Sequence, residues 1–556
     1  MAPSFLCLSV APNAQISPHR ASCDTSLSIS ARKSLKVHGL VPPQPETYAS
    51  QKARCLAQLA RSHTNIDKYL YLSALRHRNV DLFYRILIDH FIRLAPIIYT
   101  PVVGEACQRW CEIYQHPEGL YVSHRDKGRV ADIVANWPQE DVEITVMTDG
   151  SRILGLGDLG IGGMGIAIGK LVLYTGCAGI RPDRVLPLTV DTGTNNATLR
   201  FDPLYLGDRS EKVSGAEEQE LLDELLDALV RRWPRVVVQF EDWKNPFPSL
   251  ARYSQKYAMF NDDVQGTGAV IMGGVIGAVK ASGTAPRDHR AVFFGAGSAG
   301  VGVAQQIVEY FKSEGLTEAE ARRIFWFVDT KGLVTVDRGD QLPKHKVSVA
   351  RDDNDGQQFG SLEEVIDHVK PTMLMGLSTI GGAFTPAMIS KMGSWNERPI
   401  IFPLSNPVSK SECTYEEAIV HTEGRVLFAS GSPFEPFTYR DKIYHPSQGN
   451  NMYVFPGIGL GAILCKASRV TAGMIYAAGQ AVPARLSQSE LEDGLLYPRL
   501  TRIREVSAFV ALSVIRAAQK DAVDDEKSLR EMPDAQLQAL IRSQMYDPHS
   551  LLREES

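Results

Sequence analysis

Val236-Val-Val-Gln-Phe240-Glu241-Asp242 is an apolar run that ends in two carboxylates. Such a run is typical of a buried parallel strand, and ligand sites in open α/β sheets form at the carboxyl ends of these strands. A second acidic pair, Asp262-Asp263, follows about twenty residues later in Phe260-Asn-Asp-Asp-Val-Gln-Gly-Thr-Gly268. Four carboxylates in one place would repel one another unless a cation lay between them. The pattern therefore favours a divalent ion with hard oxygen ligands, Mg²⁺ or Mn²⁺.

Short β-rich runs alternate with helical patterns on both sides of this stretch. This alternation indicates parallel sheets with crossover helices. Residues 42–119 instead place apolar side chains at helical spacing. The sequence therefore predicts an α/β fold with a helical amino-terminal part. The expected strands include residues 142–147, 185–190, 235–240, 291–294 and 324–328.

A glycine-rich turn, Phe294-Gly295-Ala-Gly297-Ser298-Ala-Gly300, follows one of these strands and opens a helical pattern at 301–311. The next predicted strand is followed by an acid, Asp329. Strand, turn, helix and acid in this order are the dinucleotide-binding fingerprint, in which glycines let backbone N–H groups reach a pyrophosphate at the helix amino terminus. The alternative is a plain glycine-rich strand–helix turn. The predicted cofactor-binding residues are Gly295, Gly297, Ser298, Gly300 and Asp329.

The choice between NAD and NADP depends on the residues around the acid. Asp329 suits the ribose hydroxyls of NAD, whereas Lys331, Lys344 and Lys346 follow closely and can meet a 2′-phosphate. Loop lysines are usually only solvated. The pattern favours NADP slightly, with Lys346 as the residue that would contact the phosphate.

Other polar residues suit the recognition of a small acid. The glycine-dense block 148–170 carries Arg152 and Lys170, which fit a dicarboxylate and a proton transfer, and its glycines predict backbone packed closely on a ligand. Tyr99 projects from a turn fixed by Pro101. Most tyrosines and polar turns of this kind serve packing alone. Amide side chains that can donate to a carboxylate are Asn406, Asn450 and Asn451.

The whole chain has the composition of a globular protein of several domains. Its 556 residues are more than a single hydrophobic core usually organises. The formal net charge of −5 gives no reason to expect a nucleic-acid or membrane partner. No uninterrupted apolar run approaches the ~18 residues of a membrane span. The eight cysteines have no CxxC spacing, so zinc ligation and a disulfide framework are not expected.

The first 37 residues differ from the rest in composition. They are rich in serine and basic side chains and contain one acid, Asp24. This composition is typical of a mitochondrial transit peptide, and the alternative is a disordered tail. The expected location is therefore the mitochondrial matrix or the cytoplasm.

Taken in order along the chain, these segments resemble the malic enzymes. The resemblance runs from about residue 39 to about residue 520, and its motifs are specific. They are Tyr99-Thr-Pro, the block 148–170, Phe240-Glu-Asp242, 260–268, the Gly295 loop, Ser405-Asn-Pro, Ala429-Ser-Gly-Ser-Pro-Phe434 and Gly449-Asn-Asn-Met-Tyr-Val-Phe-Pro456.

The resemblance implies oxidation of L-malate at C2 by hydride transfer to NAD(P)⁺, loss of CO₂, and protonation of the resulting enolate to pyruvate. It implies Glu241, Asp242 and Asp263 as ligands of Mg²⁺ or Mn²⁺, which would act as a Lewis acid. Lys170 matches the general base, which needs a lowered pKa to act at neutral pH. Asp262 would orient Lys170, and Tyr99 matches the general acid.

The resemblance also implies residues that hold the substrate. Arg152 with Asn450 or Asn451 would bind the malate carboxylates, and Asn406 would lie on the nicotinamide and substrate side. Two alternatives stay open: a malolactic enzyme that keeps its cofactor and releases lactate, and a non-catalytic paralogue of the same fold. Arg54 and Arg78 match arginines that bind an activating dicarboxylate in some members of the family.

The fold implied has a helical domain at 38–117, an α/β substrate and metal domain from 118–261 and 451–522, and an inserted Rossmann-type dinucleotide-binding domain at 262–450. Residues 1–37 would be the targeting segment or tail, and 523–556 a carboxy-terminal tail. The resemblance further implies a homodimer or homotetramer.

Overall fold

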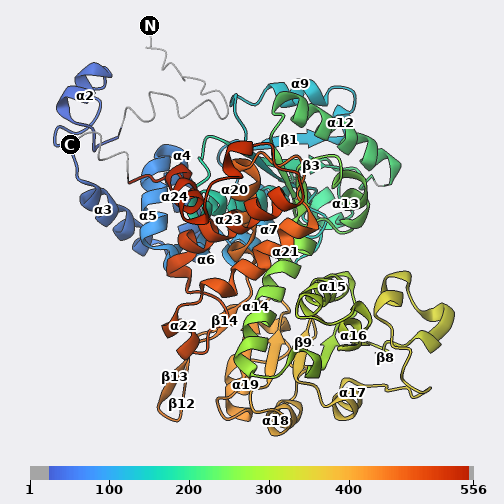
Figure 1. Cartoon of the computed structure of the whole chain (residues 1–556). Helices are drawn as coiled ribbons and strands as arrows, with labels where there is room; N and C mark the ends of the chain where they lie inside the picture. The colour runs from blue at the N-terminus through green and yellow to red at the C-terminus, as the bar shows by residue number, and fades with distance from the viewer. Residues whose placement is uncertain (1–23, 214, 550–556) are drawn as a thin grey trace. The chain divides into compact units, whose positions relative to one another are not determined.

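The computed structural model describes residues 24–213 and 215–549 (Figure 1). Contacts within the chain divide it into two compact units. Of the described residues, the first unit holds those up to Phe260, the short segment Lys466–Arg469 and those from Ala539 onward. The second unit holds Asn261–Cys465 and Val470–Gln538.

Helices form the amino-terminal part of the first unit, as the spacing of apolar residues predicted. Side chains at their amino ends satisfy N–H groups that a helix leaves unpaired. Thr64 and Asp67 form a capping box at α4, and Asn79 accepts the Leu82 N–H at 3.0 Å at the start of α5. The helices are α2 (Ile29–Ser34), α3 (Tyr48–Arg61), α4 (Asn65–Arg78), α5 (Val80–Asp89), α6 (Phe91–Ile98), α7 (Val102–Gln108) and α8 (Trp110–Ile113).

Residues 24–37, which belong to the possible targeting segment, are folded. Arg32 of α2 is 1% exposed, and its guanidinium donates to the carbonyls of Thr25, Leu27 and Pro42 at 2.7, 2.8 and 2.6 Å. These acceptors satisfy a cation that burial would otherwise penalise. Residues 1–23 lie outside the described part of the chain, so a targeting role for the segment stays a prediction.

A five-stranded sheet forms the centre of the first unit, in the order β1-β3-β2-β4-β5. Neighbouring strands run parallel at β1–β3, β3–β2 and β2–β4, so their carboxyl ends meet at one edge. Helices α9, α12 and α13 cover one face with apolar side chains, and α10 packs on β2 and β3. The strands are β1 (Leu120–Ser123), β2 (Ile144–Thr148), β3 (Val185–Asp191), β4 (Val237–Phe240) and β5 (Met259–Asn261); the helices are α9 (Val130–Ala135), α10 (Met164–Ala178), α11 (Ala197–Phe201), α12 (Ala216–Arg232) and α13 (Phe247–Tyr253).

A second sheet forms the centre of the second unit, in the order β14-β11-β10-β9-β6-β7-β8. Only the short pair β7–β8 is antiparallel among the described pairs of this sheet. The chain leaves β6 for β7 and β8 and returns on the other side of β6 at β9. This reversal is the topological switch point at which open α/β sheets bind ligands. The strands are β6 (Ala291–Phe294), β7 (Phe325–Asp329), β8 (Gly332–Leu333), β9 (Met373–Gly376), β10 (Ile400–Pro403), β11 (Leu427–Ser430) and β14 (Ser447–Gln448).

Helices cover this sheet, and a small hairpin extends from it. Helices α17, α18 and α19 bury one face against Val292, Leu374 and Ile401. The hairpin joins β12 (Phe437–Tyr439) to β13 (Lys442–Tyr444) between β11 and β14 (Figure 1). The helices are α15 (Ser298–Ser313), α16 (Glu318–Arg323), α17 (Leu362–Val369), α18 (Pro386–Trp395) and α19 (Tyr415–His421).

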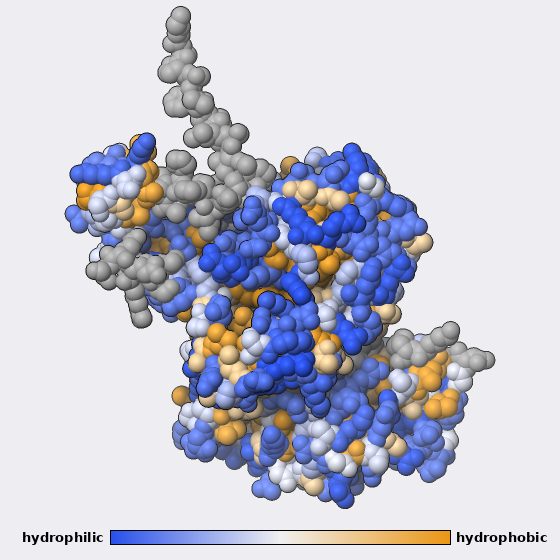
Figure 2. Space-filling view, turned by 45° about the horizontal axis from the view of Figure 1, so that its top comes forward, coloured by the Kyte–Doolittle hydropathy of each residue, from blue (hydrophilic) through white to orange (hydrophobic). Residues whose placement is uncertain are grey.

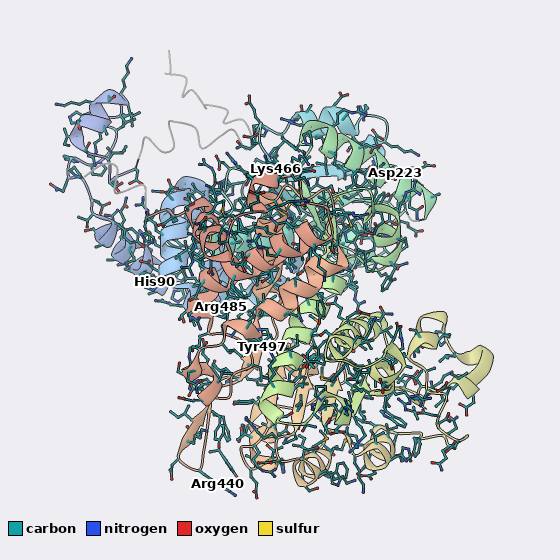
Figure 3. All side chains as sticks on the ribbon, viewed as in Figure 1. His90, Asp223, Arg440, Lys466, Arg485 and Tyr497 are labelled. Carbon is teal, nitrogen blue, oxygen red and sulfur yellow. The ribbon has the colours of Figure 1, made fainter. Side chains whose placement is uncertain are left out.

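A helical layer completes the second unit. Gly457 and Gly461 let α20 approach α23 closely, because a Cβ at either position would lie 2.6 or 2.8 Å from Val510 or Val514. The Tyr497 hydroxyl (labelled in Figure 3) donates to the Val270 carbonyl at 2.9 Å. The helices are α14 (Thr267–Ser282), α20 (Phe455–Leu464), α21 (Ala472–Ala481), α22 (Gln488–Glu492) and α23 (Ile503–Lys520), and α24 (Asp534–Gln544) follows.

This layer bears on the predicted domain boundaries. Residues 451–522 were predicted to belong to the substrate and metal domain, whereas contacts group most of them with the second sheet. The grouping reflects the packing of α21 on α14, while α20 and α23 pack on each other and on α21. The division into domains at these boundaries stays a prediction.

Two helical stretches are long and apolar enough to pass a test for membrane spans, which the sequence analysis did not expect. They are Gly160–Ala178, 100% buried, and Asp262–Ser282, 67% buried. Neither stretch is an uninterrupted apolar run, because each contains glycines and one lysine, which a helix tolerates. Core helices pass the same test, and these two pack inside their units. Hydrophilic residues dominate the surface seen in Figure 2, with apolar side chains scattered among them.

Candidate active site

A buried ion pair lies at the carboxyl end of β4. Lys170, on α10, is 1% exposed, and its Nζ lies 3.0 Å from the Glu241 carboxylate, which is 3% exposed. Gln239 donates to the same carboxylate at 2.7 Å and accepts a hydrogen bond from the Tyr174 hydroxyl. Each polar group of this set is therefore hydrogen-bonded inside the core, as a buried charge requires. The geometry fixes the Lys170 amine at the sheet edge where ligands bind.

Asp242 holds its place beside Glu241 through an unusual backbone conformation. Its φ of +58° is left-handed, which aspartate tolerates better than most residues. The Asp242 carboxylate accepts the Leu154 N–H at 3.1 Å, and its carbonyl accepts the Arg152 N–H at 3.0 Å. The backbone of the glycine-dense block thus fixes Asp242, and residues held in such conformations cluster at functional sites.

Tyr99 ends α6 and lies next to the lysine. It is 5% exposed, and the Lys170 Nζ lies 5.6 Å from the centre of its ring. Gly169 makes the approach possible, since a Cβ there would meet the Ile98 carbonyl at 3.2 Å and the Tyr99 ring at 3.4 Å. The first unit therefore brings Tyr99, Lys170, Glu241 and Asp242 together at one end of its sheet.

The glycines of block 148–170 have a different role from the predicted one at several positions. A Cβ at Gly162 would lie 2.4 Å from the Cys107 carbonyl, and one at Gly165 would lie 2.8 Å from the Cys107 sulfur. With Gly169 they form a face that α6 and α7 approach closely. The expectation that this density packs on a ligand is wrong at these three positions, because side chains and backbone of neighbouring helices fill the space.

Arg152 lies in the loop after β2 and is exposed. Among the described residues, none forms an ion pair with its guanidinium, which suits a group that binds a ligand carboxylate. The same loop contains a pair that the sequence analysis missed. Asp149 accepts from Lys212 at 2.8 Å and from the Ser151 hydroxyl at 2.7 Å. No local pattern signals this pair, because Lys212 comes from a distant loop.

In the second unit, Asp262 and Asp263 begin a π-helical turn, Asp262–Gly266, ahead of α14. Gly266 leaves room for the Asp262 carboxylate, which a Cβ there would approach to 1.8 Å. Asn451 donates to this carboxylate at 2.9 Å and to the Thr267 hydroxyl at 3.0 Å. Asn450 instead caps a short turn by accepting the Met452 N–H at 3.0 Å. Substrate binding by the two asparagines stays a prediction.

The fingerprint loop has the geometry that its glycines predict. Gly295 has a φ of +120°, and a Cβ there would lie 2.4 Å from the Leu377 carbonyl. A Cβ at Gly300 would lie 2.3 Å from the Gly295 carbonyl, whereas one at Gly297 would meet nothing within 4 Å. Crowding thus explains why Gly295 and Gly300 have no side chain. Gly297 instead borders open space at the start of α15, where a pyrophosphate would approach. The side chain of Ser298 lies outside the described part of the structure.

Two cations hold the acid at the end of β7. Asp329 accepts from Lys346 at 2.6 Å and from Arg338 at 3.0 Å, and the Lys331 N–H donates to it at 2.8 Å. Burial favours the neutral acid, but the hydrogen bonds from Lys346, the Lys331 N–H and Arg338 prevail and lower its pKa. Arg338 was missed because it lies nine residues beyond the acid, in a short 3₁₀-helical stretch, Val336–Gln341, that has no sequence signal.

Asn406 follows β10 and is exposed. Its Oδ1 accepts the Ser432 hydroxyl at 2.7 Å, and Ser432 also donates to the Ser405 carbonyl at 3.4 Å. The serine therefore orients the amide with its NH₂ group available as a donor. This arrangement suits the predicted place of Asn406 on the nicotinamide side.

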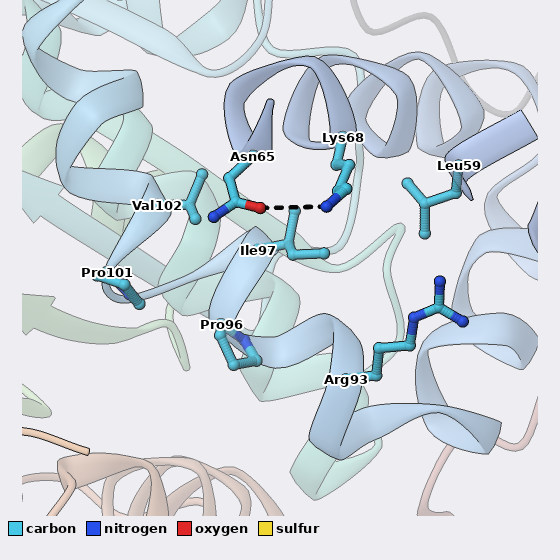
Figure 4. Close-up of a pocket in the computed structure, with 8 residues that line it drawn as sticks. All are labelled: Leu59, Asn65, Lys68, Arg93, Pro96, Ile97, Pro101 and Val102. Atoms are coloured by element: carbon cyan, nitrogen blue, oxygen red, sulfur yellow. Dashed lines mark hydrogen bonds between the residues drawn. The ribbon is translucent and has the colours of Figure 1, made fainter. Parts of the chain in front are cut away.

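Arg54 and Arg78, which match arginines that bind an activating dicarboxylate in some family members, have partners within the first unit. Arg54 pairs with Glu46, and Arg78 donates to the Ala74 carbonyl at 3.2 Å. A separate cavity of about 260 Å³ is lined in part by Pro101, which follows Tyr99 by two residues in the sequence (Figure 4). It contains none of the predicted site residues. Its lining is Leu59, Asn65, Lys68, Arg93, Pro96, Ile97, Pro101 and Val102.

Comparison with known proteins identifies two matching family models. Residues 76–257 match the malic enzyme N-terminal domain, and residues 264–519 match the malic enzyme NAD-binding domain. The NADP-dependent malic enzyme of Dictyostelium discoideum is 45% identical over 527 residues, which cover 94% of this chain and 96% of that protein. The NAD-dependent malic enzyme of Acinetobacter baylyi is 44% identical over 499 residues, or 88% of each chain.

Solved structures show the same fold. The malic enzyme of Entamoeba histolytica superposes with a TM-score of 0.57 at 22% identity and covers 83% of each chain. That of Pyrococcus horikoshii gives a TM-score of 0.55 at 24% identity, over 83% of this chain and 90% of its own. These matches confirm the predicted α/β fold.

Proposed function

The chain belongs to the malic enzyme family and carries out oxidative decarboxylation of malate with NAD(P)⁺; we propose that it prefers NADP⁺, depends on Mg²⁺ or Mn²⁺, and uses Lys170 and Tyr99 as base and acid. The observation that carries the proposal is the buried cluster of Tyr99, Lys170 and Glu241 at the carboxyl edge of the first sheet. Such a cluster places a proton acceptor and a proton donor in a water-poor setting. A non-catalytic paralogue would have no need to keep them.

Lys170 would accept the proton of the C2 hydroxyl during hydride transfer. Burial disfavours its charged form, while the Glu241 carboxylate at 3.0 Å favours it. A cation held by Glu241 would reduce that stabilisation and leave the amine able to act as a base. In decarboxylation the same group can return a proton, and Tyr99 beside it would protonate C3 of the enol.

The donor set fits a hard divalent cation. Glu241 and Asp242 are buried carboxylates at the end of one strand, and Asp263 would supply a further carboxylate. When held by these carboxylates, an ion of this kind would supply Lewis-acid stabilisation of negative charge on the substrate oxygens. The protein's contribution is to fix Glu241 through Gln239 and Asp242 through the Leu154 N–H.

The cofactor preference follows from the charges around Asp329. A lone carboxylate there would bind ribose hydroxyls and repel a 2′-phosphate. Arg338 and Lys346 offset its charge and leave the local balance positive, which favours NADP⁺. The names of the relatives include both NADP-dependent and NAD-dependent enzymes.

An assay with L-malate, Mn²⁺ and NADP⁺ tests this function. We expect reduction of the cofactor with pyruvate and CO₂ as products, and NAD⁺ to give a lower kcat/KM. Release of lactate without net cofactor reduction would instead identify a malolactic enzyme. Chelation of divalent ions should stop turnover, and added Mn²⁺ should restore it. Activity that persists after chelation would contradict the metal requirement.

Two further proposals concern the assembly and the location. A homodimer or homotetramer is supported by the resemblance of the chain to its family, and sedimentation of the purified protein would test it. The serine- and arginine-rich start supports the mitochondrial matrix, with the cytoplasm as the alternative. A fluorescent protein fused at the carboxyl end would distinguish the two compartments.

A further inference from the structure

A buried carboxylate that the proposed mechanism does not use lies behind the carboxyl ends of β9 and β10. Glu412 is 0% exposed. One of its oxygens accepts the Ser378 N–H at 2.9 Å, the Ser378 hydroxyl at 2.8 Å and the Ser405 hydroxyl at 2.5 Å. The other accepts the Ser405 N–H at 3.4 Å. Among the described residues no cation pairs with it, so neutral donors from two loops hold this acid.

The end of strand β9 is shaped around this carboxyl group. A Cβ at Gly376 would lie 2.4 Å from the Glu412 carboxyl carbon. Only a residue without a side chain therefore fits at the end of β9. Four hydrogen-bond donors converge on this side chain, so it must be a group that accepts hydrogen bonds and donates none. Among side chains of this length, only a carboxylate has this property. The packing and the hydrogen bonds both select glutamate at position 412.

The same network holds a strained residue. Thr379 has a φ of +60°, which is unfavourable for a β-branched side chain. Its N–H donates to the Ser405 hydroxyl oxygen at 2.9 Å, and that hydroxyl donates to Glu412. The chain from Thr379 through Ser405 to Glu412 ties the loop after β9 to the loop after β10.

These two loops border the candidate cofactor site of the second unit. The Leu377 N–H donates to the Phe294 carbonyl at 2.8 Å, so the first loop lies against the fingerprint turn at Gly295. The second loop carries Asn406, whose amide Ser432 orients. Both loops lie on the β9–β10 side of the switch point, where the nicotinamide half of a dinucleotide would extend.

We propose that Glu412 is a positioning residue, which fixes both loops so that their backbone groups and Asn406 meet the nicotinamide end of the cofactor. The proposal rests on the proposed function for the identity of the ligand. Glu412 does not touch the cofactor; it acts through Ser378, Thr379 and Ser405. Loosening it should therefore weaken cofactor binding and slow hydride transfer while the second sheet stays folded.

The test compares Glu412→Gln with a matched control, Glu417→Gln. Glu417 lies five residues further along and also accepts an N–H and a hydroxyl, but from Thr414, in the cap of α19 away from both loops. In Glu412→Gln an NH₂ group faces N–H and O–H donors. We expect the Kd for NADPH, measured by its fluorescence, to rise about tenfold and kcat to fall about tenfold. Both would be measured below the unfolding temperature of each variant.

The control should shift the unfolding temperature without changing either quantity. If Glu412→Gln and Glu417→Gln give the same NADPH Kd and the same kcat, the proposal is wrong. Should Glu412→Gln not fold, Ser405→Ala and Ser378→Ala test the same network, and each should raise the NADPH Kd about threefold. Unchanged affinity in both serine variants would equally overturn it. Because the Kd needs no malate turnover, a failure of the proposed function is separable from a failure of this inference.

Discussion

Lys170 is the residue on which the proposed chemistry depends most directly. It is buried, and its amine contacts Glu241 and the ring of Tyr99. We expect Lys170→Ala to lower kcat by about 10³-fold, in the range that removal of a general acid–base group gives. NADPH affinity should stay within about twofold, since the lysine belongs to the other unit from the fingerprint loop.

The control for this variant is Lys256→Ala, which removes an exposed lysine that pairs with Asp227. Exposed pairs of this kind contribute little to stability. Steady-state kinetics and NADPH fluorescence should be measured on both proteins. Full activity in Lys170→Ala would refute its role as the base.

At the level of single residues, the proposed cofactor preference depends on Arg338 and Lys346. Both donate to Asp329, and both are largely buried. We expect Lys346→Gln and Arg338→Gln each to raise the KM for NADP⁺ about tenfold and to change the KM for NAD⁺ much less, because only NADP⁺ carries the 2′-phosphate. Equal effects on the two cofactors would count against the NADP⁺ preference. A suitable control is Lys391→Gln, which changes a partly exposed lysine on α18.

At the scale of elements, a buried histidine joins the two central strands of the second sheet. His289 precedes β6, is 2% exposed, and its Nδ1 lies 2.9 Å from the hydroxyl of Thr372, which precedes β9. Burial lowers the pKa of His289 to about 4. The folded protein therefore holds this side chain neutral at pH values where the unfolded chain binds a proton.

The sign of the pH effect follows from this shift. Above pH ~6.5 the histidine is neutral in both states, so its contribution to stability is fully present. As the pH falls towards 4 the unfolded chain gains a proton first, and the free energy of unfolding should fall by at most about 3 kcal/mol. Denaturant unfolding at several pH values should show a smaller fall in His289→Asn than in the parent protein. The exposed His38 gives the control, His38→Asn, which should keep the parent slope.

At the scale of the whole molecule, the carboxy-terminal segment returns to the start of the chain. Within the first unit, the Tyr546 hydroxyl donates to Asp81, the Arg85 guanidinium donates to the Pro548 carbonyl at 2.6 Å, and the Tyr546 N–H donates to the Gly179 carbonyl at 2.7 Å. Burial, followed by the charge of Asp81, raises the pKa of Tyr546. Residues far apart in sequence thus close the helical part of this unit.

Removal of residues 539–556 should therefore destabilise the first unit. The loss of three hydrogen bonds and the associated packing is expected to lower the free energy of unfolding by about 3 kcal/mol. Thermal unfolding would measure the change, with Lys256→Ala, which removes only an exposed ion pair of the same unit, as the control. This control should leave the transition unchanged. A normal transition after removal of 539–556 would show that these contacts do not stabilise the unit.

Much of the fold follows from local pattern. The apolar runs at 291–294 and 235–240 correspond to β6 and β4, and the fingerprint glycines lie between strand and helix as predicted. Short elements without periodicity, such as β8 and the β12–β13 hairpin, gave no signal. The glycines of block 148–170 were predicted to pack on a ligand. A glycine-rich sequence indicates that another group approaches the backbone closely, but it does not show whether that group is a ligand or a neighbouring helix.

The sequence by itself determined the order of strands and helices, the dinucleotide fingerprint, the acids at strand ends and, through its motifs, the family. These features are local, since main-chain geometry within a few residues fixes them. The tertiary structure decided the partner of each charged group: Lys170 with Glu241, Arg338 and Lys346 with Asp329, and Glu412 with two serines. Lys170 and Glu241 are about seventy residues apart, and crossover connections of a parallel sheet bring them together. Burial then makes each pairing obligatory, because a charged group inside the core must find its partner there.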